Sequence, residues 1–304
     1  MEKMLSVSMA GLTLKTPVLA ASGTFGYGLE YAKAADLSRI GGIIVKGLSL
    51  EPSKGNPDPR VVETASGLLN AVGLENIGIH AFIAEKLPRL KKFGTPVIVN
   101  LYGKRVEDYV ELAAICEKEP DIAALELNIS CPNVKAGGLA FGTDPVAAAS
   151  LTEAVRRETG KPLIVKLSPN VTDIRPIALA VEKAGADVLS LINTLTGMSI
   201  DAETRKPRLA NITGGLSGPA IKPVALRMVW EAASCVKIPI IGLGGIMNAM
   251  DAIEFLVAGA SAVAVGTGNF INPRITIEIA EGIGRYLKKN KMASVKELTG
   301  SLAV

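Results

Sequence analysis

The chain has 304 residues, a length that suits either one large (β/α) barrel or about two smaller domains. Hydrophobic residues make up 48% and charged residues 20%, which argues against disorder, and a net charge of only +4 argues against a nucleic-acid-binding protein. Three cysteines are too few for a four-thiolate cluster and favour a reduced, cytoplasmic protein without a disulfide framework.

The first residues, LSVSMAGLTLK, lack a secretory pattern and predict a β-hairpin that turns at Ala10 and Gly11 and closes the bottom of a barrel. Eight short apolar runs without clean alternation then predict parallel strands that are covered on both faces. These runs are Pro17–Gly23, Gly42–Gly47, Pro96–Leu101, Ala124–Ser130, Pro162–Ser168, Val188–Thr194, Ile238–Gly245 and Ala262–Gly268. Segments with helical periodicity lie between most of them, at Val106–Glu119, Pro145–Thr159, Arg175–Ala184 and Met250–Ala258.

Most intervals between strand starts match one βα unit of roughly 30 residues, which favours a single (β/α)8 TIM barrel, α/β class, over residues 1–304. A doubly wound sheet is the main alternative. Two longer segments, Leu48–Thr95 and Leu195–Lys237, open with loops at the carboxyl end of a strand. We expect these insertions to cover the C-terminal face, where barrels bind their ligands. The uncharged stretch Phe255–Pro273 contains several Gly and Asn residues, so no membrane span is expected.

Polar or glycine residues follow the apolar run of each predicted strand. They are Ser22, Lys46, Asn100, Asn128, Ser130, Cys131, Lys166, Asn193, Thr194, Gly244, Gly245, Gly266 and Thr267. Buried lysine and asparagine side chains need partners, so this pattern predicts a polar ligand at the barrel mouth. A polar layer that is satisfied internally is the alternative.

The last two strands end in the glycine-rich sequences GLGGI and GTGN. Backbone N–H groups after the seventh and eighth barrel strands often bind a phosphate, although glycine-rich turns also occur without one. The chain has no GxGxxG motif, so no nicotinamide-binding site is visible.

Cys131, in NISCPN, stands at the predicted mouth and is a candidate nucleophile or base. Buried structural thiols are expected at Cys116 and Cys235, and the single histidine, His80, receives no role. No cluster of metal-ligating residues is visible, so no metal site is expected.

The chain resembles the dihydroorotate dehydrogenase family over nearly its whole length. The resemblance rests on ASGTFGYG, VKGLSLEPSKGNPDPRVVET, GLLNAVGLEN, NISCPNVKAGGLAFGTDP, VKLSPN, NTLTGM, GGLSGPAIKP, GLGGI and AVGTGNF, in this order. It implies an FMN-binding barrel that oxidises (S)-dihydroorotate to orotate in pyrimidine biosynthesis.

The resemblance also implies roles for individual residues. Cys131 is the base that removes the C5 proton, and the C6 hydride passes to the flavin N5. The implied flavin-binding residues are Ser22, Lys46, Gly47, Asn100, Asn128, Lys166, Ile192, Gly218, Gly244, Gly245, Gly266 and Thr267, of which the last four hold the phosphate. The implied substrate-binding residues are Lys46, Asn70, Ala71, Val72, Gly73, Leu74, Asn128, Asn193 and Thr194.

A cysteine rather than a serine at position 131 resembles the soluble class 1 enzymes. The membrane-associated class carries an N-terminal extension that this sequence does not show. NVKAGGLAFGTDP and KGNPDPRVVET resemble the NAD-linked class 1B form. That form implies an iron–sulfur partner subunit that carries FAD and a 2Fe-2S cluster, in a heterotetramer of two copies of each chain.

Alternative functions stay open on the sequence alone. A fumarate-linked class 1A homodimer and a related pyrimidine-reducing flavoenzyme share the same features. A barrel that binds a phosphorylated metabolite without redox chemistry is a more distant alternative.

Overall fold

A computed structural model describes residues 2–130 and 141–303 of the chain, and within them eight parallel strands close into a barrel. The barrel strands are β3 (Val18–Ala20), β4 (Gly42–Ile44), β7 (Val97–Leu101), β8 (Ala124–Asn128), β9 (Leu163–Lys166), β10 (Val188–Leu191), β15 (Ile240–Leu243) and β16 (Ala262–Val265). Each strand pairs with the next in this order, and β16 pairs with β3 through Val263 opposite Val18. All eight predicted strands are therefore confirmed, and the doubly wound alternative is wrong because β16 closes on β3.

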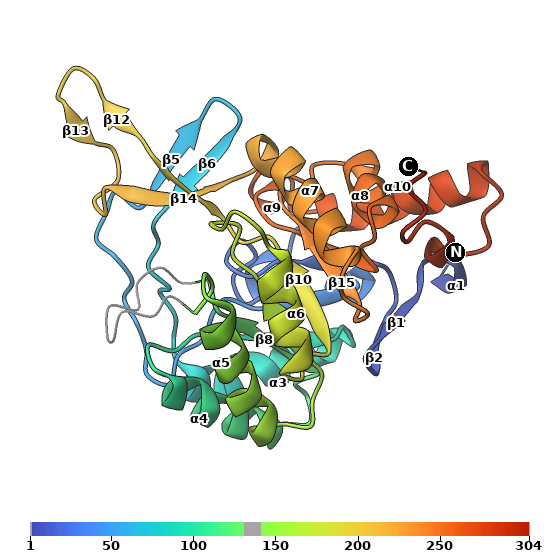
Figure 1. Ribbon diagram of the computed structural model, residues 1–304, viewed down its shortest axis with the longest axis horizontal. Coiled ribbons are helices and arrows are strands. Elements are labelled where there is room, and N and C mark those ends of the chain that lie inside the picture. The colour runs from blue at the N-terminus through green and yellow to red at the C-terminus, as the bar shows by residue number, and fades with distance from the viewer. Residues whose placement is uncertain (1, 131–140, 304) are drawn as a thin grey trace.

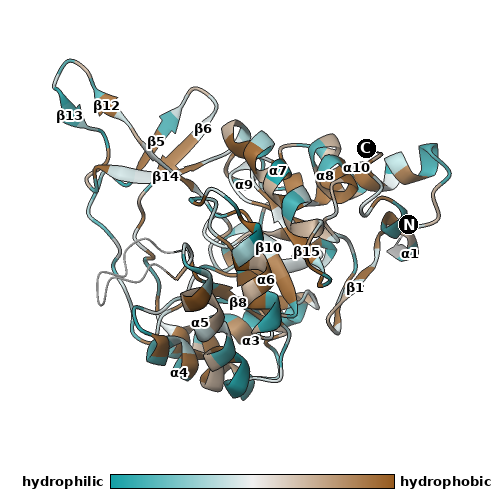
Figure 2. Cartoon of the chain, viewed as in Figure 1, coloured by the Kyte–Doolittle hydropathy of each residue, from teal (hydrophilic) through white to brown (hydrophobic). Residues whose placement is uncertain are grey.

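The strands are apolar on both faces because each face contacts a different part of the core. Alternate residues such as Leu19, Ile44 and Ile98 fill the inside of the barrel. The residues between them, such as Val18 and Val99, pack outward against the helices. Figure 2 shows the hydrophobic colour along the central strand β10, whereas the outer helices carry both colours.

The predicted hairpin is confirmed at the amino end of the chain, after the short helix α1 (Glu2–Leu5). Strands β1 (Val7–Met9) and β2 (Leu12–Leu14) pair antiparallel. Met9, Leu12 and Leu14 are buried against the residues inside the barrel, so the hairpin closes the end opposite the strands' carboxyl termini.

The helices are α2 (Ile79–Ala81), α3 (Leu87–Leu90), α4 (Val106–Glu117), α5 (Pro145–Glu158), α6 (Arg175–Lys183), α7 (Lys222–Ala233), α8 (Ala249–Val257), α9 (Gly268–Ile271) and α10 (Ile275–Lys289). The four predicted helices are confirmed as α4, α5, α6 and α8, with ends that differ by at most two residues. Short 3-10 segments lie at η1 (Leu29–Tyr31), η2 (Leu37–Arg39), η4 (Lys91–Phe93), η5 (Pro219–Ile221) and η6 (Val295–Glu297), and Phe82–Lys86 (η3) is a π-helical turn.

Local sequence explains where these helices begin and how closely they pack. The Asp144 carboxylate accepts hydrogen bonds from the backbone of Val146 and Ala147, which caps α5 at its amino end. A side chain at Gly242 of β15 would place its Cβ 2.7 Å from the Phe255 ring, so glycine allows α8 to lie against the barrel.

The two long insertions pair with each other, which their sequences do not reveal. Strands β5 (Val61–Thr64) and β6 (Gly67–Asn70) come from the first insertion, and β11 (Leu195–Met198) and β14 (Thr213–Ser217) from the second. They form one sheet in the order β11-β14-β6-β5. A smaller hairpin, β12 (Ile200–Asp201) and β13 (Lys206–Pro207), extends from it. Figure 1 shows this sheet and the β1–β2 hairpin on opposite sides of the barrel.

Across the described residues, no helix is both long enough and apolar enough to cross a membrane.

Candidate active site

The residues predicted to bind a ligand end the barrel strands on one face, which is also where the insertion sheet lies. Asn100, Asn128 and Lys166 are the inward-facing residues at the carboxyl ends of β7, β8 and β9. Ser22, Lys46, Asn193 and Thr194 follow β3, β4 and β10 by two or three residues. Parallel strands place their carboxyl ends together, so the structure brings these side chains to the barrel mouth.

Direct contacts connect several of these residues. The Asn193 side-chain amide donates to Asn128 Oδ1 at 3.4 Å, and the Ser130 hydroxyl donates to the Lys166 carbonyl oxygen at 3.0 Å. Lys46 Nζ lies 3.9 Å from a carboxylate oxygen of Glu75, which is itself paired with Arg60. Lys46 is therefore held at the mouth but remains about one quarter exposed and can reach a ligand.

Two buried polar groups at the mouth lack partners among the described residues. Lys166 is only 6% exposed, yet its ammonium group makes no hydrogen bond or ion pair there. Asn100 is 1% exposed, and its Oδ1 has no hydrogen-bond donor within the same residues. A buried cation and a buried carbonyl oxygen are costly without partners, so both point to a bound ligand with acceptor and donor groups.

Glu126 and Ser190 also belong to this polar layer, and the sequence reasoning missed them. Glu126 lies inside β8, fully buried, and accepts hydrogen bonds from Asn100 Nδ2 at 2.5 Å and from the Ser190 hydroxyl at 2.8 Å. A charged residue within the run ALELN was the available signal, because a buried carboxylate in a central strand requires partners.

The first insertion contributes the loop Asn70–Leu74, which begins at the end of β6. Asn70 pairs in register with Gly215 of β14 and donates from Nδ2 to its carbonyl oxygen at 3.2 Å. The Asn56 side chain donates to the Ala71 carbonyl oxygen, and Asn56 N donates to that of Val72. These bonds hold the loop in place beside the mouth.

The glycine turns after β15 and β16 lie together with Gly218. A Cβ on Gly245 would lie 2.9 Å from the Gly218 carbonyl oxygen, and a Cβ on Gly218 would lie 3.5 Å from the Thr267 methyl group. The Thr267 hydroxyl donates to Ser217 Oγ at 2.8 Å. Ile192 lies beside Gly244, at 3.3 Å from a Cβ placed there. Gly244 and Gly245 have φ values of 130° and 75°, so this glycine cradle, formed by Gly218, Gly244, Gly245 and Gly266, needs residues without a side chain at these two positions.

The structure describes two of the three cysteines, Cys116 and Cys235. Cys131 lies outside the described residues. Cys116 is fully buried in α4, and burial raises the pKa of its thiol to about 12. Burial also raises the pKa of the Cys235 thiol, but Cys235 is only half-buried, so the prediction of a buried thiol is wrong at this position. Both thiols are poor nucleophiles at neutral pH, as expected for structural cysteines.

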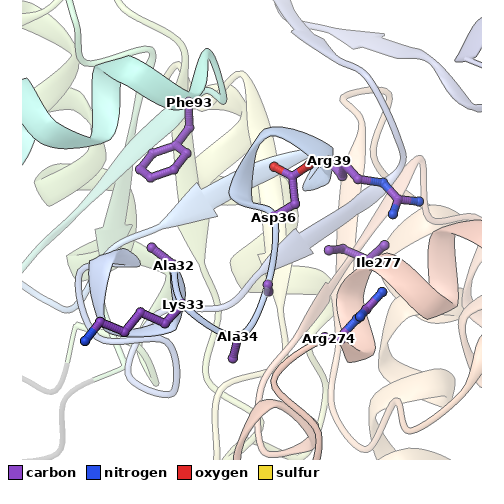
Figure 3. A pocket seen from close by; sticks show the side chains of 9 residues that line it. Ala32, Lys33, Ala34, Asp36, Arg39, Phe93, Arg274 and Ile277 are labelled. Atoms are coloured by element: carbon purple, nitrogen blue, oxygen red, sulfur yellow. The ribbon is translucent and has the colours of Figure 1, made fainter.

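A separate surface cavity of about 380 Å³ lies on the flank of the barrel, between the loop after η1 and the start of α10. Figure 3 shows Phe93 on one side of it and Arg39, Ile277 and Arg274 on the other. None of the predicted site residues lines this cavity. The barrel mouth, not the flank, therefore carries the candidate chemistry.

A closed parallel barrel with a polar layer and a glycine cradle at its mouth is typical of barrel enzymes that bind phosphorylated ligands. The chain belongs to the dihydroorotate dehydrogenase family, whose pattern it matches over residues 4–287.

Curated relatives agree along nearly the full length. The chain is 62% identical over 298 residues to the dihydroorotate dehydrogenase B (NAD(+)) catalytic subunit of Geotalea uraniireducens strain Rf4, covering 98% of each chain. It is 62% identical over 300 residues to the protein of the same name from Geotalea daltonii, covering 99% of this chain and 98% of the relative. The Geobacter sulfurreducens protein of that name is 60% identical over 300 residues, with the same coverage. The words "catalytic subunit" imply a second subunit in those relatives.

Proposed function

We propose that this chain oxidises (S)-dihydroorotate to orotate with FMN bound at the barrel mouth, as the catalytic subunit of an NAD-linked dihydroorotate dehydrogenase. The observation that carries the proposal is the buried, unpartnered Asn100 Oδ1 at the barrel mouth, together with Lys166, which is buried and has no ion pair among the described residues. Identity of about 60% to relatives of that name over nearly the whole chain supports the same reaction.

The residues present fit FMN in their chemistry. The flavin ring offers carbonyl oxygens and ring nitrogens to the Lys166 ammonium group and an N–H group to Asn100 Oδ1. Its phosphate suits the backbone N–H groups around Gly244, Gly245 and Gly266. The other flavin-binding residues in this proposal are Ser22, Lys46, Gly47, Asn128, Ile192, Gly218 and Thr267.

In this proposal, the substrate, a planar and anionic ring, is bound by side chains that carry hydrogen-bond donors. Lys46 pairs with the carboxylate, and the amides of Asn70, Asn128 and Asn193 pair with the ring amide groups. Ala71, Val72, Gly73, Leu74 and Thr194 complete the set, and together they orient the substrate and exclude water.

The reaction removes two hydrogens from neighbouring carbons. Cys131 takes the C5 proton as general base, and the C6 hydrogen leaves as hydride with its electron pair. Bound FMN supplies the hydride acceptor at N5. The positive charge of Lys166 would stabilise the negative charge that the ring of a bound flavin gains on reduction.

The electrons then pass to NAD through a second protein. The resemblance to the NAD-linked form and the name of its relatives favour a partner subunit that carries FAD and a 2Fe-2S cluster, in a cytoplasmic heterotetramer. Three cysteines and the lack of a dinucleotide-binding motif in this chain agree with that proposal. In this proposal, residues 1–304 act as one FMN-binding barrel domain.

A visible spectrum of the purified chain, recorded before and after anaerobic addition of dihydroorotate, tests the proposal. We expect a flavin band that bleaches on addition of the substrate. A flavin band that does not bleach contradicts the substrate assignment, and absence of flavin after FMN is supplied, with the partner co-expressed, contradicts the whole proposal. Rapid reoxidation by fumarate instead of NAD with the partner would assign the chain to the class 1A reaction.

A further inference from the structure

Glu126 is a carboxylate inside the barrel, fully buried and one layer below the mouth, with no role in the reaction proposed above. Its neighbours on the strand, Leu125 and Leu127, face the helices and are also fully buried. Glu126 faces the barrel interior together with Asn100 of β7, its partner in register. A buried carboxylate is costly, so its hydrogen bonds decide what it does here.

Both oxygens of the Glu126 carboxylate accept hydrogen bonds. Oε1 accepts from the Ser190 hydroxyl at 2.8 Å, and Oε2 accepts from Asn100 Nδ2 at 2.5 Å. In this arrangement both oxygens of Glu126 act as acceptors, so the Nδ2 group of Asn100, and not its Oδ1, faces Glu126. If the Asn100 amide were reversed, its carbonyl oxygen would meet a carboxylate oxygen at the same distance, and two acceptors repel each other. Glu126 therefore permits one orientation of the Asn100 side chain.

That orientation turns Asn100 Oδ1 away from Glu126 and toward Gly47. A Cβ placed on Gly47 would lie only 2.9 Å from Asn100 Oδ1, so a side chain there would crowd this oxygen. Oδ1 is buried and has no donor among the described residues. Asn100, which carries the unpartnered acceptor Oδ1, is thus hydrogen-bonded directly to Glu126, which fixes the direction of that acceptor.

We propose that Glu126 is a positioning residue, which holds Asn100 so that its Oδ1 accepts a hydrogen bond from a ring N–H of the bound flavin. This inference rests on the proposed function, because it takes FMN as the ligand. Glu126 itself touches neither cofactor nor substrate, and it acts only through the Asn100 amide.

The test compares FMN affinity among variants of the full chain. FMN-loaded protein is diluted, released FMN is followed by the recovery of its fluorescence, and Kd is obtained together with the Tm of each variant. In Glu126→Met, a side chain of similar length removes the acceptor and frees the Asn100 amide to turn. We expect Kd to rise about tenfold or more, the factor expected for losing one ordered hydrogen bond.

A paired exchange separates positioning from a structural role. In Glu126→Gln combined with Asn100→Asp, the amide of the new glutamine donates to one oxygen of the new aspartate, and the other oxygen still faces the flavin. The number of charges inside the barrel is unchanged. We expect Kd within about fivefold of the wild-type value. Because the exchange keeps the charge, it decides the question even where Glu126→Met does not fold.

Glu117→Met is the matched control, because the Glu117 carboxylate also accepts two hydrogen bonds, from Thr159 and Gly160, away from the mouth. It should leave Kd unchanged even if Tm falls. A folded Glu126→Met protein with Kd within twofold of wild type overturns the proposal, as does a folded exchange variant that binds FMN more than tenfold more weakly. Failure of the wild-type protein to bind FMN refutes the proposed function instead, and it is seen before any variant is made.

Discussion

The Asn70 side-chain amide donates a hydrogen bond to the Gly215 carbonyl oxygen at 3.2 Å, across 145 residues of sequence. This contact joins the two insertions, because Asn70 ends β6 and Gly215 lies within β14. It places the loop Asn70–Leu74 at the mouth and ties its position to the second insertion. The loop that we propose binds the substrate thus depends on a strand pairing that lies outside the barrel.

Replacing Asn70 with alanine should therefore raise KM for dihydroorotate about tenfold, the effect of one lost hydrogen bond, while FMN stays bound. Steady-state kinetics and the visible spectrum of the same preparation measure the two effects. Asn211→Ala is the matched control, since Asn211 is exposed in the turn just before β14, and its side chain bonds only to Thr213 within the described residues. Equal KM values for Asn70→Ala and Asn211→Ala would contradict the assignment.

Replacing Cys131 with serine should leave the flavin spectrum intact and lower kcat about 100-fold or more, because a serine hydroxyl loses its proton far less readily than a thiol, so little of the anionic base is present near neutral pH. Stopped-flow bleaching of the flavin by dihydroorotate measures the step directly. Cys116→Ser and Cys235→Ser serve as controls and should retain the wild-type bleaching rate. A Cys131→Ser protein that bleaches at the wild-type rate would remove Cys131 from its role as base.

Replacing Lys166 with alanine should make the flavin reduction potential more negative, because a buried cation favours the negatively charged reduced ring. FMN affinity should fall about tenfold as well, since a hydrogen bond from a charged group is lost. Spectroelectrochemical titration measures the potential. An unchanged potential in a variant that still binds FMN would show that Lys166 does not face the ring.

Replacing Gly245 with alanine should weaken FMN binding about tenfold. Its φ of 75° costs alanine roughly 1–2 kcal/mol, and the added Cβ would lie 2.9 Å from the Gly218 carbonyl oxygen. Gly94→Ala shares the positive φ, at 61°, but has no atom within 4 Å of its added Cβ. Both variants should lose stability, whereas only Gly245→Ala should lose FMN affinity in the fluorescence assay. A similar loss of affinity in both would assign the effect to general destabilisation.

The stability of the chain should depend on pH through Glu117. A hydrogen bond from the Thr159 hydroxyl, with one from the Gly160 amide, lowers the pKa of the Glu117 carboxyl below its ordinary value. Because the pKa is lower in the folded state, the carboxylate stabilises the fold above about pH 4.3, and this contribution is lost as pH falls through the lowered pKa. Glu117→Gln should unfold more readily than wild type near pH 7. Denaturant titrations should show this difference shrinking toward pH 3, and a difference that stays constant would contradict the assignment.

The barrel could be predicted from sequence because its signals are local. Runs such as PVIVN and PLIVK are apolar on both faces, which only a strand covered on both sides allows, and each ends in Asn or Lys at the same point of the βα unit. Since parallel strands end together, local order along the chain was enough to gather Asn100 and Lys166 at one mouth.

The insertion sheet and the polar layer were decided only by tertiary structure. The pairing of β6 with β14 depends on register between distant segments whose sequences, GLLN and TGGLS, carry little alternation to specify it. Glu126 and Ser190 looked like ordinary interruptions of apolar runs. Their role is visible only in the closed barrel, where side chains of β7, β8 and β10 face the interior. There, hydrogen bonds join Asn100, Glu126 and Ser190, which no local sequence pattern connects.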